Sequence, residues 1–176
     1  MSNPLFVPLD MARLCDAFEQ SSGAVSFYLD TQTGAIERIG EETRRILYGL
    51  QEMYGADDGT LDIEMALSRR DLGARVKDDL RAAHRIESGF GSRYRKVPES
   101  DSMDGYADMK AFAESADAAL REQLWRAMQG TGGRARFESA LRNTPAEFER
   151  WQAYRAGRMQ ARVNAWLAEE GIAAAG

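Results

Sequence analysis

The sequence predicts a predominantly helical α+β protein that forms a single domain over residues 1–176. A chain of this length can bury about two thirds of its unfolded surface, so one core suffices. Apolar residues recur at helical spacing along most of the chain, and one short stretch alternates around a turn, as strands do. We therefore expect a small antiparallel sheet, made of an N-terminal hairpin and one further strand, packed with about five to six helices.

The N-terminal elements are a short helix, a β-hairpin and a second helix. Apolar spacing predicts the first helix over residues 9–20. β-branched and aromatic residues predict strands over 24–29 and 35–39, and Gly34 in the turn between them can adopt positive φ. Helical spacing returns over residues 41–54 and ends before a glycine-containing acidic loop.

The section over residues 55–92 is predicted to be a helical insertion. Apolar residues from Leu72 to Ile86 fit one amphipathic helix, although Gly73 weakens its start. Residues 92–97 then read as a third strand, which Pro98 ends. This strand would complete the antiparallel sheet.

The C-terminal half carries the strongest helical signal. Apolar residues stand three or four apart from Tyr106 to Met128, which predicts one long helix or two helices with a bend, ended by Gly130. A short helix is expected around Phe137. Pro145 suits the first position of a last helix that runs to about residue 170.

Composition favours a cytoplasmic protein. No 18 apolar residues stand together, and the N-terminal segment lacks the basic start and apolar run of a signal peptide. The lone Cys15 lies in an apolar helical pattern, so we interpret it as a packing residue in a reducing compartment.

Charge is unevenly distributed along the chain. The formal net charge is -5, which argues against broad attraction to nucleic acid or anionic lipid. The segment from Arg121 to Trp166 nevertheless holds nine arginines and four acids, a net charge of +5, so the remainder carries -10. Neutralisation of the basic part by the acidic part within the fold is the first expectation.

Several short pieces of sequence carry a resemblance to a known family. They are Tyr28-Leu29-Asp30-Thr31-Gln32-Thr33-Gly34, Tyr106-Ala107-Asp108-Met109-Lys110-Ala111-Phe112, Gly133-Arg134-Ala135-Arg136-Phe137 with Leu141, Trp151 with Tyr154, and Trp166-Leu167-Ala168-Glu169-Glu170-Gly171-Ile172. Together and in this order they resemble the bacterial Uncharacterised Protein Family 0158 over residues 24–40 and 93–172. The stretch from Gly55 to Gly91 is interpreted as specific to this chain. The resemblance implies a small α+β protein and no activity.

No catalytic, metal-binding or phosphate-binding motif is evident. The sole histidine, His84, lies among charged residues and is read as solvated, and His84 with Cys15 cannot supply the four ligands of a structural zinc site. The acidic residues after Gly55 lack the ligand order of a calcium loop. We expect no catalytic residue, no metal and no cofactor.

The glycine-rich stretch Gly130–Gly133 follows a helix, so it is not the glycine loop of a dinucleotide-binding unit. It can be a simple connection between helices. Alternatively, its backbone amides together with Arg134 and Arg136 could hold an anion at a helix start.

The last helix places arginines among its aromatic residues. At about 100° per residue, Arg155, Arg158 and Arg162 fall within the arc that also holds Phe148, Trp151, Tyr154 and Trp166, whereas Arg150 falls on the opposite side from Phe148. Such arginines must find partners for their charged heads. Asp108, Glu114, Asp117 and Asp30 are candidate internal partners; the alternative is that the heads protrude and bind another molecule.

Three functions remain open at this point. The preferred hypothesis is a non-enzymatic interaction or regulatory module that binds a partner protein. Its expected site lies in the C-terminal part and comprises Arg134, Arg136, Trp151, Tyr154, Arg155, Arg158 and Arg162. A nucleic-acid-associated regulator is the alternative. The second alternative is an enzyme that uses carboxylates and arginine on a phosphate-bearing substrate.

Overall fold

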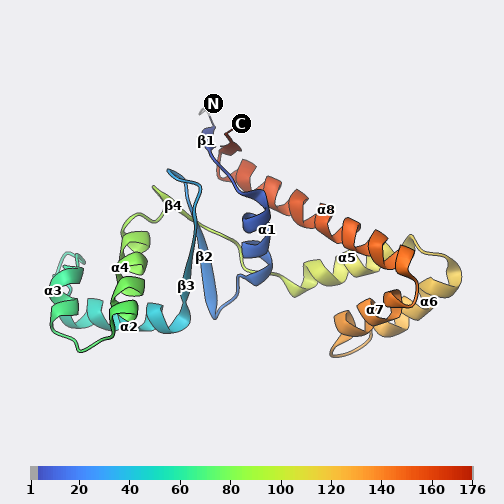
Figure 1. Cartoon of the computed structure of the whole chain (residues 1–176), viewed down its shortest axis with the longest axis horizontal. Coiled ribbons are helices and arrows are strands. Elements are labelled where there is room, and N and C mark those ends of the chain that lie inside the picture. The colour runs from blue at the N-terminus through green and yellow to red at the C-terminus, as the bar shows by residue number, and fades with distance from the viewer. Residues whose placement is uncertain (1–3, 176) are drawn as a thin grey trace. The chain divides into compact units, whose positions relative to one another are not determined.

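The computed structural model describes residues 4–175, and this range contains eight helices and five short strands (Figure 1). The predicted α+β class is confirmed. The chain divides into two compact units: unit 1 comprises residues 1–100 and 167–176, and unit 2 comprises Asp101–Trp166. Each unit is described by itself.

The sheet of unit 1 is the predicted antiparallel one. Its strands are β2 (Val25–Asp30), β3 (Ile36–Gly40) and β4 (Tyr94–Lys96), in the order β3-β2-β4. Both partners of β2 run antiparallel to it. The hairpin and the third strand were therefore predicted correctly.

The hairpin turn requires glycine for two reasons. Gly34 has a φ of +75°, which disfavours any side chain. A Cβ built on it would also overlap the backbone carbonyl oxygen of Pro8. The turn thus packs directly against the main chain of the N-terminal segment.

The described part of unit 1 also contains four helices. They are α1 (Met11–Gln20), α2 (Glu41–Tyr54), α3 (Ile63–Ser68) and α4 (Ala74–Ser88). The middle section thus holds two helices where one was predicted, because Asp62 accepts a hydrogen bond from the Met65 amide and starts α3.

Buried side chains from these helices and the sheet form the core of unit 1. Leu47 and Leu50 of α2 pack with Leu80 and Ile86 of α4 and with Tyr94 of β4. The core therefore joins the middle section to the sheet. Whether the section is an insertion stays a prediction.

A second, two-stranded sheet in unit 1 was not predicted. Strand β1 (Leu5–Val7) pairs in parallel with β5 (Ile172–Ala174), so segments from near both ends of the chain lie side by side (Figure 1). Strands of three residues are too short to show an alternating pattern.

Unit 2 consists of helices. They are α5 (Ser102–Glu114), α6 (Ala118–Ala127), α7 (Gly133–Arg142) and α8 (Pro145–Glu169), the last of which belongs to unit 2 as far as Trp166. The choice between one long helix and two is settled in favour of two. Asp117 accepts a hydrogen bond from the Leu120 amide and begins α6, which breaks the run.

None of the helices among residues 4–175 is both long and apolar enough to cross a membrane. The single-domain organisation of the chain stays a prediction beside the two compact units.

Candidate functional site

Asp108 of α5 is a buried carboxylate that two arginines of α8 share. It is only 4 % exposed. It accepts a hydrogen bond from Arg158 Nε at 2.9 Å, and its second oxygen lies 2.7 Å from Arg162 Nη2. Arg162 Nε also lies 3.3 Å from Asp104. Arg158 and Arg162 are therefore paired within the fold. Their shared partner, Asp108, is one of the four acidic residues that were expected as internal partners.

The geometry follows from helical spacing. Arg158 and Arg162 stand four residues apart, as do Asp104 and Asp108, so each pair occupies one helix face. The Arg158 side chain remains 49 % exposed although its partner is buried. The hydrogen bond to Asp108 raises the pKa of Arg158 above its ordinary value. Arg158 thus neutralises the buried carboxylate while part of its own side chain stays in contact with solvent.

Trp151 lies in the core of unit 2 and not on its surface. Its ring is 2 % exposed and packs against Phe112 and Phe137, with centroids 5.2 and 5.0 Å away. Tyr154 stacks on it and is half-buried. The indole Nε1 has no hydrogen-bond partner among the described residues. Trp151 is therefore a core residue that packs beneath the surface of unit 2.

Arg136 satisfies carbonyl groups at the end of α6. Its guanidinium donates to the carbonyl oxygens of Thr131, at 2.7 Å, of Ala127, at 3.2 Å, and of Gln129. The Ala127 carbonyl is one of those that the C-terminus of α6 leaves unpaired, and the other two belong to the connection that follows the helix. In this geometry the head of Arg136 serves the connection between helices, as the simpler reading of Gly130–Gly133 predicts.

The other two predicted arginines lie elsewhere on unit 2. Arg134 is exposed, with its Nε 3.4 Å from Glu138 one turn along α7. Arg155 is half-buried on α8. The seven predicted residues thus come from two helices of unit 2, α7 and α8.

Arg150 is the residue that the helical wheel missed. Its guanidinium lies 4.3 Å from the centroid of the Phe112 ring, donates to Ser115 Oγ at 2.8 Å, and donates twice to Glu147 Oε2, at 3.0 and 2.6 Å. On the wheel, Arg150 lies about 40° beyond Tyr154, so an arc extended past Tyr154 would have included it.

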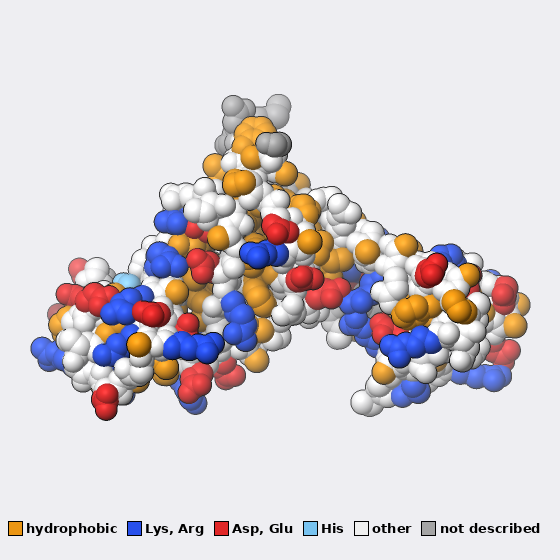
Figure 2. Space-filling model, viewed as in Figure 1, with side chains coloured by type: hydrophobic (Ala, Val, Ile, Leu, Met, Phe, Trp, Pro, Cys, Tyr) orange, Lys and Arg blue, Asp and Glu red, His pale blue; other side chains and the backbone are white. Residues whose placement is uncertain are grey.

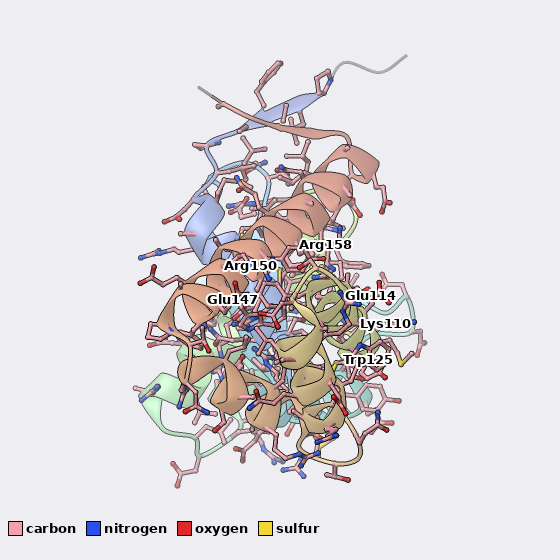
Figure 3. The ribbon with its side chains drawn as sticks, turned by 90° about the vertical axis from the view of Figure 1, so that its right-hand side faces the viewer. Lys110, Glu114, Trp125, Glu147, Arg150 and Arg158 are labelled. Carbon is pink, nitrogen blue, oxygen red and sulfur yellow. The ribbon has the colours of Figure 1, made fainter. Side chains whose placement is uncertain are left out.

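Three arginines of α8 therefore donate to α5 or to Ser115, which directly follows it. We name Arg150, Arg158 and Arg162 the arginine row. Their partners are Ser115, Asp108 and Asp104 with Asp108, respectively. Their side chains are 41 %, 49 % and 23 % exposed. Figure 3 labels Arg150, Arg158 and Glu147 on α8.

A further cation lies over an aromatic ring on neighbouring helices. Lys110 Nζ of α5 is 5.9 Å from the centroid of the Trp125 ring of α6, and Glu114 follows Lys110 by one helical turn (Figure 3). Pairs of this kind add about 0.5–1 kcal/mol at exposed sites.

The basic segment of the sequence is neutralised within unit 2. Residues 101–166 hold ten basic and nine acidic side chains, a net charge of +1, so the rest of the chain carries -6. On the face shown in Figure 2, Lys and Arg side chains are interspersed with Asp and Glu. The predicted internal match is thus observed, with the acids of α5 opposite the arginines of α8.

Within residues 4–175 no group of three or more His, Cys, Asp and Glu side chains is placed to hold a metal ion. His84 is half-buried on α4.

The family of the chain follows from comparison with family models. The model of an uncharacterised protein family, UPF0158, matches residues 74–175, which is more than half of the sequence. The chain belongs to UPF0158. The UPF0158 match includes the whole of unit 2 and all seven predicted site residues. Neither the curated proteins nor the solved structures contain a match.

The extent of the match corrects one expectation. Residues 74–91 were interpreted as specific to this chain, but they lie inside the UPF0158 match, so that interpretation is wrong for them. They form α4, whose Leu80, Ala83 and Ile86 pack in the core with Tyr94. The hairpin, which was included in the resemblance, lies outside the matched residues.

Proposed function

We propose that this protein is a non-enzymatic, cytoplasmic interaction module that binds an acidic segment of a partner protein through the arginine row. The observation that supports the proposal is the position of Arg150. It is held by the Phe112 ring, Ser115 and Glu147, yet it keeps 41 % of its side chain exposed.

An arginine held in this way loses little conformational freedom when it binds a carboxylate. Ordering a free, rotamer-rich side chain costs about 0.5–1.5 kcal/mol, and packing on Phe112 removes most of that cost before binding. Its exposed ion pair with Glu147 contributes little, so a partner carboxylate can replace it. Arginine is also among the residues enriched at binding hot spots.

An acidic protein suits this surface better than a nucleic acid. Asp104 and Glu147 lie beside arginines of the row with part of their side chains exposed, and they would repel a phosphate backbone. A protein segment can place single carboxylates opposite single guanidinium groups.

The test compares two variants of equal net charge. Arg150→Gln with Arg158→Gln removes two heads of the row, whereas Arg126→Gln with Arg75→Gln removes two exposed arginines elsewhere. The probes are a labelled peptide of alternating glutamate and leucine and a single-stranded oligonucleotide of similar length. Circular dichroism confirms that each variant is folded.

We expect the row variant to bind the peptide about tenfold more weakly than the native chain and the control variant to bind as the native chain does. Equal peptide binding by both variants would rule out the row as the site. Tighter, salt-dependent binding of the oligonucleotide would instead favour the nucleic-acid alternative.

A further inference from the structure

An open pocket of about 440 Å³ lies in unit 1 beside strand β4. Its lining includes Phe90, Arg95 and Lys96 from β4 and the turn before it, together with Glu169 and Glu170 at the end of α8. All five residues lie inside the UPF0158 match and outside unit 2. The pocket is therefore separate from the arginine row.

The two cations of the pocket already have partners. Arg95 Nε lies 3.0 Å from Glu170 Oε2, and Lys96 Nζ lies 3.5 Å from Glu99 Oε1. An anionic ligand would have to break one of these pairs. The pocket is thus not an anion site in its present state.

Glu169 is the charged group that is left without a partner. None of the described residues lies within hydrogen-bond or ion-pair distance of its carboxylate, which is exposed. It is also the last residue of α8, and the last turn of that helix contains no basic residue. A carboxylate at a helix C-terminus is repelled by the negative end of the helix dipole, and a cation there relieves the repulsion.

Phe90 offers an aromatic surface to the same pocket. Its ring is 60 % exposed and meets Tyr28 edge-on, with an interplanar angle of 84° and centroids 6.4 Å apart. The edge contact leaves a ring face uncovered. An aromatic face and a carboxylate are together the groups that bind ammonium and guanidinium ions.

From this arrangement we propose that the pocket binds an organic cation, an ammonium or guanidinium group, between the Glu169 carboxylate and the Phe90 ring. The net charge of -6 outside unit 2 attracts such a ligand. This site goes beyond the proposed function, because it lies in the other unit and takes a ligand of opposite charge.

The backbone favours a basic side chain of a protein as the source of the cation. Strand β4 is at the edge of its sheet. The amide of Val97 donates to Phe27 and that of Thr31 to Arg93, so the alternation of an antiparallel ladder directs the main-chain groups of Lys96 to the outer edge. A peptide residue can pair there while its side chain enters the pocket.

The experiment titrates the full chain with three small probes and follows the backbone amide signals of Phe90 and Lys96 by NMR. The probes are a blocked single lysine residue, acetylated and methylamidated; its neutral analogue with norleucine in place of lysine; and butylammonium. We expect saturable shifts with lysine and none with norleucine. Tighter binding of the blocked lysine than of butylammonium assigns the site to a protein side chain, and the reverse assigns it to a free amine.

Two variants and a control locate the cation. Glu169→Gln should weaken lysine binding about tenfold, and Phe90→Leu about threefold, whereas Glu149→Gln, on an exposed part of the same helix, should bind as the native chain does. Glu169→Gln removes an unfavourable charge, so it should melt no lower than the native chain. Binding of norleucine equal to that of lysine, or unchanged binding by Glu169→Gln, would overturn the proposal.

Discussion

Asp108 determines how two arginines of α8 are held, although it is itself hidden from solvent. With Asp108→Ala, Arg158 loses its partner and Arg162 keeps only Asp104. We expect the free energy of unfolding to fall by about 2 kcal/mol, because two charge-assisted contacts are lost while the arginine heads can still reach water. Urea denaturation measures the change.

Asp104→Asn is the matched control for that prediction. Asp104 is 56 % exposed, and among the described residues its carboxylate pairs with Arg162 alone, so its loss should cost less than about 0.5 kcal/mol. An equal loss of unfolding free energy for the two substitutions would mean that the burial of Asp108 does not increase its contribution to stability.

Asp30 gives unit 1 a pH dependence of known sign. Arg93 donates to both of its oxygens, at 2.9 and 2.6 Å, and this lowers the pKa of Asp30 to about 2. A lowered pKa stabilises the fold above the unfolded value near 3.9, and the stabilisation is lost as the pH falls from about 4 to about 2.

The corresponding variant is Asp30→Asn. At pH 7 it should be less stable than the native chain by about 1–2 kcal/mol, since Arg93 is partly exposed. The difference should shrink to near zero at pH 2 in denaturant titrations. A difference that stayed constant over this range would contradict the assigned ion pair.

Single residues were predictable from the sequence only in part. Helical spacing placed Arg158 and Arg162 on an aromatic face and named Asp108 among four partners. It could not choose among the four, because the choice depends on how α5 packs against α8. Arg136 was missed as a carbonyl partner for the same reason: its acceptors belong to another helix and its connection.

The hairpin turn is the element most sensitive to a single methyl group. Gly34→Ala would combine a strained positive φ with overlap between the new Cβ and the Pro8 carbonyl. We expect a loss of more than about 2 kcal/mol or no folded protein. Thermal unfolding followed by circular dichroism measures the loss.

Gly59→Ala measures the effect of backbone strain without the steric overlap that a side chain at residue 34 would cause. Gly59 has a φ of +82°, close to that of Gly34, but a Cβ there would meet nothing within 4 Å. Its loss should be about 1 kcal/mol. If both substitutions lower the stability by the same amount, steric overlap with Pro8 does not contribute to the loss at Gly34.

Elements were predicted best where a pattern is long. The helix expected over residues 41–54 has those bounds as α2, because its apolar stripe spans four turns. Helix α3 and the strands β1 and β5 are too short for any period to show. The break between α5 and α6 was left open because Ala116 and Leu124 continue the stripe across it, and only the cap at Asp117 marks the end.

At the scale of the whole molecule, α8 contributes to both units. It carries Trp151 into the core of unit 2 and continues to Leu167, which is buried and belongs to unit 1. Melting of either unit would leave part of this helix without its packing. We therefore expect the chain to unfold in one transition, as the single-domain prediction requires.

Scanning calorimetry of two variants tests this expectation. Asp30→Asn alters unit 1 and Asp108→Ala alters unit 2, and each should shift the same single peak. A calorimetric enthalpy equal to the van't Hoff enthalpy supports one transition. Two peaks, each moved by only one of the variants, would show two domains.

The location of Trp151 also determines which part of the chain is visible by tryptophan fluorescence. All three tryptophans, Trp125, Trp151 and Trp166, lie in unit 2, and unit 1 contains none. The tryptophan emission therefore originates in residues of unit 2, and the buried indole of Trp151 should keep part of it at short wavelength until the Phe112 and Phe137 cluster opens. A stopped-flow trace of this emission would time the folding of unit 2 without any introduced label.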